Sequence, residues 1–180
     1  MDEELINKLG LDFNKIIYAD NGDINYDGDI DLRSLGLDEI PIQFDKVFGN
    51  FYLSGNKIKS LKNSPKFVGG DFRFGFNLIE DLNYSPCIIS GNFYGAYNNI
   101  SSLHGIPRII GRNIYLHKNS GNFEWSVVDT LIKQKNGRIG GQIYTEDQME
   151  NREETMIYIN GKFNKKFSHL LKKEDWVDYE

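Results

Sequence analysis

The sequence has little of what several classes of protein require. It contains one cysteine in 180 residues, Cys87, which excludes an internal disulfide and any metal cluster built on several cysteines. We interpret Cys87 as an incidental thiol, because no arrangement of histidine or asparagine stands near it in the sequence. The histidines show no spacing typical of metal ligands. They are His104, His117 and His169.

Long apolar runs and a basic leader are also missing. No run approaches the ~18 apolar residues of a membrane span. The chain starts MDEELINKLG, which is acidic where a secretory signal is basic and then apolar. We therefore expect a cytoplasmic protein without a membrane contact. With 39% hydrophobic and 26% charged residues, the composition is typical of one soluble domain or one capped repeat array.

The familiar catalytic motifs are absent as well. An enzyme needs a nucleophile with its base, a carboxylate pair, a metal set or a phosphate cradle. The sequence contains no GxSxG, HExxH, GxxxxGK[ST] or CxxC. The glycine-rich VGGDFRFGF resembles a nucleotide loop only superficially, because its glycines recur every 21 residues. We expect no enzyme activity, no metal and no cofactor, with a metal-dependent hydrolase in the C-terminal tail as the open catalytic alternative.

What the sequence has instead is a repeat with a period of 21 residues. Four stretches align without a gap, the last one partial. They begin at Val47, Val68, Ile89 and Ile110. One step further back, YDGDIDLRSLGLDEIPIQFDK from Tyr26 fits the same frame. This unit explains the acidic DINYDGDIDL better than a calcium loop does, because Ser34 stands where such a loop needs a bidentate Glu.

Each unit predicts a short strand followed by a turn. The alternation of Phe51 and Leu53 with other residues is typical of a half-buried strand. An asparagine then turns the chain, and we expect stacked copies to form a ladder that satisfies backbone groups. The glycines before the strands suit a tight corner, and the prolines mark the back of each coil. These residues are Asn56, Asn77, Asn98 and Asn119; Gly49, Gly70 and Gly91; and Pro65, Pro86 and Pro107.

The units resemble the leucine-rich repeat family and its pattern L-x-L-x-x-N-x-L-x-x-L. In one unit the pattern is carried by Phe51, Leu53, Asn56, Ile58 and Leu61. More closely, VGGDFRFGFNLIEDLNYSPCI is similar to the 21-residue repeats of uncharacterised tailed-bacteriophage proteins. The resemblance spans about residues 26–122 and implies a repeat solenoid, a leucine-rich-repeat-like stack of short parallel strands in about five coils. It departs at Leu35, which replaces the ladder asparagine, and in the second half of the fifth unit.

Atypical segments flank the array, as a stack with two open apolar ends requires. We expect residues 1–25 to form an N-terminal cap with a helix. We expect residues 123–180 to form a C-terminal cap and an α+β tail, beginning with a helix across the last coil. The apolar residues at helical spacing are Leu5, Leu9 and Phe13 at the front, and Phe123, Val127 and Leu131 at the back.

The outward side chains of the stacked strands form the candidate site, because stacking places equivalent residues about 4.8 Å apart. Tyrosine and arginine beside small residues are typical of interface hot spots, although tyrosine also suits exposed strands without any function. We predict a non-catalytic protein-binding module. The phage resemblance implies a viral protein that binds a host defence or regulatory protein in the host cytoplasm. The predicted binding residues are Asp31, Tyr52, Arg73, Tyr94 and Tyr115, with Phe76, Tyr97 and His117 beside them.

The charge distribution keeps a second function open. Residues 1–46 carry 4 basic and 12 acidic groups, net −8, whereas residues 47–122 carry 8 and 3, net +5. A basic middle can attract an anionic ligand such as a nucleotide signal or a nucleic acid. That ligand would use cationic side chains and the faces of tyrosine rings. They are Arg73, Arg108, Arg112, Lys118, Tyr94 and Tyr97.

Overall fold

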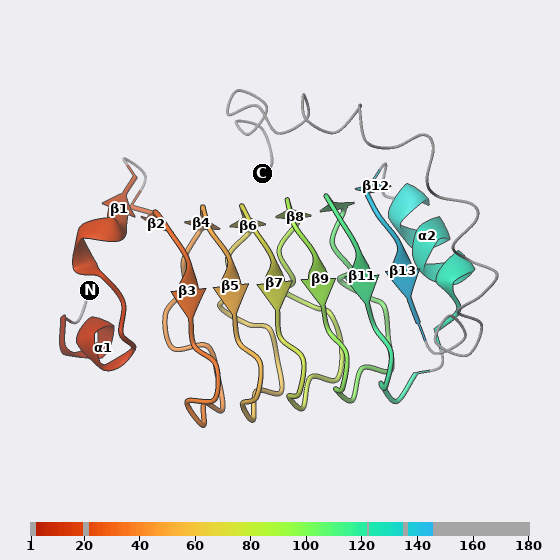
Figure 1. Ribbon diagram of the computed structural model, residues 1–180, viewed down its shortest axis with the longest axis horizontal. Helices are drawn as coiled ribbons and strands as arrows, with labels where there is room; N and C mark the ends of the chain where they lie inside the picture. The colour runs from red at the N-terminus through yellow and green to blue at the C-terminus, as the bar shows by residue number, and fades with distance from the viewer. Residues whose placement is uncertain (1–2, 20–21, 122, 135–136, 146–180) are drawn as a thin grey trace.

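The chain folds into a repeat solenoid built from two sheets whose strands are parallel from coil to coil (Figure 1). A computed structural model describes residues 3–19, 22–121, 123–134 and 137–145. Sheet A has the strand order β1-β2-β4-β6-β8-β10-β12, and sheet B has the order β13-β11-β9-β7-β5-β3. Each coil contributes one strand to each sheet, so the predicted stack of short parallel strands is confirmed.

The elements are short and recur at the period of the repeat. Sheet A consists of β1 (Ile16–Tyr18), β2 (Ile24–Tyr26), β4 (Lys46–Val47), β6 (Phe67–Val68), β8 (Ile88–Ile89), β10 (Ile109–Ile110) and β12 (Arg138–Ile139). Sheet B consists of β3 (Ile30–Asp31), β5 (Phe51–Tyr52), β7 (Phe72–Arg73), β9 (Phe93–Tyr94), β11 (Ile114–Tyr115) and β13 (Ile143–Tyr144). The helices are α1 (Glu3–Lys8), the 3-10 turn η1 (Phe13–Lys15) and α2 (Trp125–Gln134).

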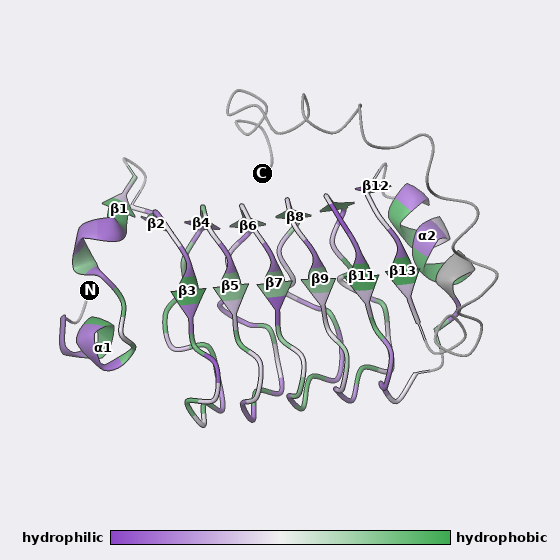
Figure 2. Ribbon diagram, in the orientation of Figure 1, coloured by the Kyte–Doolittle hydropathy of each residue, from purple (hydrophilic) through white to green (hydrophobic). Residues whose placement is uncertain are grey.

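The inward side chains of sheet B stack on their equivalents in the next coil. Phe51, Phe72 and Phe93 are paired in register, and all three are fully buried. Their ring centroids lie 5.9 and 6.1 Å apart. Hydrophobic residues therefore recur at the same height in successive strands (Figure 2). Burial of these large rings stabilises the three coils that contain them.

At one core position, a larger side chain in one coil is matched by a smaller residue in the next coil. Leu32 and Leu53 fill this position in the first two coils, Phe74 in the third, and Gly95 in the fourth. A Cβ atom on Gly95 would lie 2.5 Å from the ring of Phe74. The glycine thus leaves room for the larger ring of its neighbour.

The predicted asparagine ladder is confirmed. The Oδ1 atom of Asn77 accepts a hydrogen bond from the backbone N–H of Ile58 at 3.1 Å. Its Nδ2 group donates to the carbonyls of Leu53 and Phe74, both at 3.0 Å. One side chain therefore satisfies three backbone groups at a buried corner. The same pattern recurs at Asn56, Asn98 and Asn119.

A second ladder, which the sequence did not predict, runs along the corner between the two sheets. Asp29 accepts a hydrogen bond from the backbone N–H of Asn50, and Asn50 accepts one from that of Asp71, both at 2.7 Å. The ladder continues through Asn92, Asn113 and Gln142. A Cβ atom on Gly49 would collide with Asp29, which explains the glycine at this corner. The acidic stretch around Asp29 is therefore the first coil of the array, as the repeat predicted.

The N-terminal cap contains a shorter helix than predicted. Helix α1 ends at Lys8, and Gly10 follows with a φ of 68°. Ile6 is fully buried and Leu9 nearly so, whereas Phe13 is 44% exposed. The prediction that Phe13 belongs to the buried helical face is wrong, because the chain has left the helix before it. Strand β1 then pairs antiparallel with β2 and closes sheet A at this end.

The predicted helix across the last coil is confirmed, with a different buried face. Helix α2 lies at the end of the stack opposite α1 and contacts β12 and β13 (Figure 1). Val128 and Ile132 are buried, whereas Val127 is 46% exposed, so the prediction for Val127 is wrong by one position. Strands β12 and β13 pair with β10 and β11, so the array continues beyond residue 122. The predicted tail from residue 146 lies outside the described residues.

Candidate binding face

The outward residues of sheet B form a continuous column along the solenoid. The predicted residues pair in register from coil to coil, and β13 adds a sixth. We call this set the tyrosine–arginine column. It consists of Asp31, Tyr52, Arg73, Tyr94, Tyr115 and Tyr144.

The flat groups of this column stack face to face. The rings of Tyr94 and Tyr115 lie 4.3 Å apart at 7°, and those of Tyr115 and Tyr144 lie 4.6 Å apart at 4°. The guanidinium carbon of Arg73 lies 4.4 Å from the ring centre of Tyr94 and 5.6 Å from that of Tyr52. These contacts combine π-stacking with cation–π attraction. They fix the side chains, so the column presents ring edges and hydroxyls to solvent with little entropy left to lose on binding.

Two ion pairs within single coils orient the arginines. Arg33 contacts Asp31 at 2.5 Å, and Arg73 contacts Asp71 at 2.6 Å. The hydrogen bond from Arg33 lowers the pKa of Asp31. Burial alone would raise the pKa of Asp71, but hydrogen bonds from Asn92 and Arg73 outweigh it and lower the pKa. Both carboxylates are therefore ionised at neutral pH, and each partner guanidinium is held against a tyrosine ring.

Tyr52 and Tyr94 of the column are neutral hydrogen-bonding groups. Burial raises the pKa of Tyr52 and Tyr94 above the ordinary value of 10.0. The Tyr115 hydroxyl accepts a hydrogen bond from the Nδ2 group of Asn113 at 3.2 Å. Because Tyr52 and Tyr94 keep their protons at neutral pH, their hydroxyls can both donate to and accept from a partner.

A second row lies where each strand of sheet B turns, and we call it the corner column. Phe76 and Tyr97 stack at 4.4 Å and 9°, and His117 meets the Tyr97 ring edge-on at 5.5 Å. Between the two columns lie Gly75 and Ala96, which are buried. The structure therefore brings the predicted Phe76, Tyr97 and His117 together beside the tyrosine–arginine column. The corner column consists of Ser34, Gly55, Phe76, Tyr97 and Lys118.

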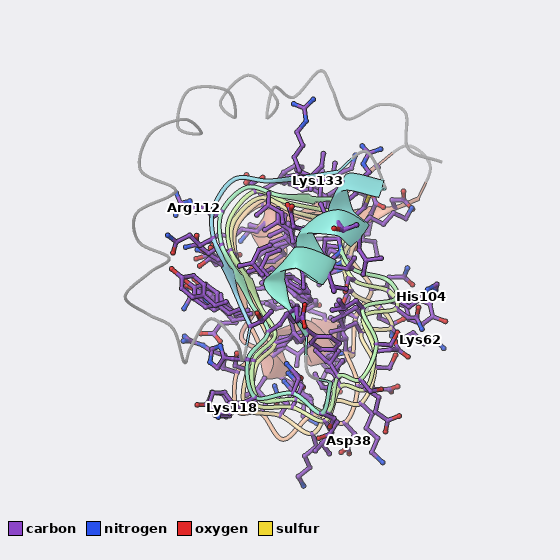
Figure 3. The ribbon with its side chains drawn as sticks, turned by 90° about the vertical axis from the view of Figure 1, so that its right-hand side faces the viewer. Asp38, Lys62, His104, Arg112, Lys118 and Lys133 are labelled. Atoms are coloured by element: carbon purple, nitrogen blue, oxygen red, sulfur yellow. The ribbon has the colours of Figure 1, made fainter. Side chains whose placement is uncertain are left out.

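Some of the residues predicted for an anionic ligand lie near this face. Arg112 and Lys118 occupy the same side of the coil, away from Lys62 and His104 (Figure 3). Arg108 lies elsewhere, in the segment that leads into β10 of sheet A. The tyrosine rings offer little free surface for a base, because Arg73 and Tyr115 cover the two faces of Tyr94.

Two residues of this face were not predicted from the sequence. Tyr144 belongs to RIGGQIY, which repeats IGRNIY of the preceding coil. Helix α2 separates the two copies, so a comparison without gaps does not align them. Asp71 was not assigned to the site, although its position two residues before Arg73 places both near the start of the same strand.

No protein-family model, curated protein or solved structure matched the chain. The arrangement of side chains on the solenoid is therefore the basis for the functional proposal.

The described residues also bear on membrane spans and metal sites. The helices there are too short or too polar to cross a bilayer. In the same part of the chain, no cluster of three or more His, Cys, Asp or Glu side chains has a geometry suited to a metal ion.

Proposed function

We propose that this protein is a non-catalytic binding module that recognises a partner protein through the outward face of sheet B. The observation that carries the proposal is the unbroken stack of tyrosine rings and guanidinium groups in the tyrosine–arginine column. Tyrosine and arginine are the residues most often found at interface hot spots, because they bury large area and form directed hydrogen bonds. Their rigidity here supports the proposal further, since a fixed side chain loses little entropy on binding.

The fold itself does not require these residues. Position 31 is Asp, position 73 is Arg, and the other coils have Tyr, yet the backbone pairing is the same in all of them. The inward residue that precedes each of them in the strand, by contrast, is apolar in every coil. The core does not require aromatic residues in this outward column. Their presence there is therefore consistent with a binding surface.

The family and the biological context of the protein are part of the same proposal. We propose a leucine-rich-repeat-like protein of a tailed bacteriophage that acts in the host cytoplasm on a defence or regulatory protein. The support is the similarity of the 21-residue unit to phage repeats. The ladder asparagines are the part of that pattern with a clear structural role, because each satisfies backbone groups of two coils.

An anionic ligand is the second candidate. The net charge of +5 over residues 47–122 and the placement of Arg112 and Lys118 beside sheet B favour it. Such binding weakens steeply with salt because counterions are released, whereas a protein interface shows weak salt dependence and a large negative heat-capacity change. Titration calorimetry at two salt concentrations distinguishes the two candidates once a ligand is in hand.

Affinity capture from a bacterial lysate tests the proposal. The native chain is compared with the variant Y52A/R73A/Y94A/Y115A, and with a control variant, K62A/H104A, whose changes lie on the opposite side of the coil (Figure 3). We expect one protein to be retained by the native chain and the control and lost by the column variant. The purified protein should then bind the native chain directly. Equal retention by all three chains, or retention of no protein, contradicts the proposal.

A further inference from the structure

The corner column contains aromatic residues where the backbone favours glycine. Phe76 and Tyr97 have φ angles of 57° and 58°, in the left-handed region. This conformation costs a residue with a Cβ atom about 1 kcal/mol. In the preceding coil Gly55 occupies the same corner with a φ of 77°. The backbone would therefore accept glycine in every coil, and the two rings occupy this corner in spite of the strain.

The row of rings stops at Gly55. The backbone continues in register, with the N–H of Gly55 donating to Gly75 and the N–H of Phe76 donating to Ala96, both at 3.1 Å. One face of the Phe76 ring is covered by Tyr97 at 4.4 Å. Its other face points toward the coil of Gly55, where this column has no side chain. Phe76 is accordingly 61% exposed, against 43% for Tyr97.

The surroundings of Gly55 suit a ring rather than a cation. The Oγ atom of Ser34 lies 2.9 Å from the position that a Cβ atom on Gly55 would take. Lys57 is exposed two residues after Gly55. The positive charge of Lys57 attracts the electron-rich face of an aromatic ring and repels a cation.

We propose that the surface over Gly55 is a subsite for an aromatic side chain of the partner, which stacks on the open face of Phe76. The ring lies about 4.5 Å from Phe76, as in the existing pairs, and extends the row by one member. This subsite rests on the proposed function, since it names the group of the partner that the face receives. It also gives a reason for the strained corners, because a glycine at position 76 would remove the surface on which the ring stacks.

Variants at Gly55 test the subsite. In Gly55→Phe the chain supplies the missing ring itself and blocks the subsite. The change is sterically tolerable, because Phe76 and Tyr97 occupy the same conformation and the only close atom is the flexible end of Ser34. Gly55→Ala is the matched control, since it has the same backbone strain and the same Cβ contact but no ring. Both variants are first compared with the native chain by urea denaturation to establish that they are folded.

The probe is N-acetyl-tyrosinamide, titrated into labelled protein while the amide resonances of Gly55, Phe76 and Tyr97 are followed by NMR. We expect saturable shifts in the native chain and in Gly55→Ala, and at least tenfold weaker binding to Gly55→Phe. N-acetyl-argininamide serves as the cationic comparison and should bind more weakly than the tyrosine probe. The proposal is overturned by an absence of saturable shifts, by equal shifts in Gly55→Phe, or by tighter binding of the arginine probe.

This titration and the affinity capture can fail independently. If a partner is captured through the column but the tyrosine probe leaves Gly55 and Phe76 unchanged, the proposed function stands and the subsite is wrong. If the probe binds and is blocked by Gly55→Phe but no protein is captured, the ring site stands and the protein-binding function is wrong.

Discussion

The buried asparagine ladder and the exposed tyrosine–arginine column run along the same stack, and only one of them is uniform. The ladder has asparagine at the same position in four successive coils, Asn56 to Asn119. The column changes from Asp31 to Tyr52 to Arg73 and then to tyrosine. Within each row, the residues occupy equivalent backbone positions in successive coils. Backbone geometry alone therefore does not explain why one row is uniform and the other is not.

Burial explains it. A buried corner leaves backbone donors and acceptors that only a short amide can satisfy, so the fold dictates asparagine. An outward strand position faces water and accepts many side chains. The fold does not determine the residue type at these outward positions. Tyrosine and arginine there can therefore be selected for binding. The following changes test this difference, from the largest expected effect on stability to the smallest.

Asn77→Ala is expected to cause the largest loss. It leaves the N–H of Ile58 and the carbonyls of Leu53 and Phe74 without their side-chain partner. Unsatisfied buried groups cost about 1 to 3 kcal/mol each, and partial relaxation gives an expected total of about 3 kcal/mol. Urea denaturation measures it. Leu35→Ala, at the exposed equivalent in the first coil, is the control and should change little. A loss below about 1 kcal/mol for Asn77→Ala contradicts the role of the ladder.

Gly95→Ala is expected to destabilise by about 2 kcal/mol, because the new methyl group overlaps the ring of Phe74. The change Phe74→Leu restores the residue type of the first two coils and should relieve the overlap. The double variant is therefore expected to lose less unfolding free energy than the sum of the losses in the two single variants. Additive losses in a denaturation cycle would show that the two residues do not share this space.

Tyr94→Ala is expected to cost only about 1 kcal/mol, from the loss of its stacks with Arg73 and Tyr115. The same change should remove most of the binding. Thermal denaturation and a binding titration on the same sample test both parts. A loss of stability as large as that of Asn77→Ala would make the column a structural element like the ladder.

Asp71→Asn is expected to have the smallest effect, about 0.5 kcal/mol at neutral pH. Asparagine preserves the corner ladder, as Asn50 and Asn92 do, and removes only the ion pair with Arg73. Because the folded pKa of Asp71 lies below its ordinary value of 3.8, its contribution is complete above pH 3.8 and is lost as the pH falls through the folded pKa. Denaturation of both chains in a series from pH 7 downward should give a difference that shrinks as the pH falls below 3.8. A difference that stays constant over the whole pH series cannot come from the ion pair.

The period of 21 residues made much of this structure predictable. Once Val47 and Val68 are aligned, the register of Tyr52 with Arg73 and the asparagine ladder follow directly. Sheet A was not predicted, because strands of two residues such as Phe67–Val68 are too short to show alternation. The exposed Val127 was misassigned because the face of α2 that packs on the stack depends on how the helix docks, which periodicity does not fix.

Site residues were predictable to the extent that they follow the repeat. Tyr144 was not, because α2 interrupts the period before it. The stacking of Arg73 between Tyr52 and Tyr94 depends on rotamers and on the ion pair with Asp71, which residue spacing does not specify. The open face of Phe76 became visible only when its exposure was known.

The central claim is that the tyrosine–arginine column serves binding and is not needed for folding. The most direct measurement pairs the affinity capture of native and Y52A/R73A/Y94A/Y115A chains with the denaturation midpoint of each. We expect the variant to stay folded, with a cooperative transition, and to lose a partner that the native chain retains. A variant that is folded and retains the partner as well as the native chain does would contradict the claim.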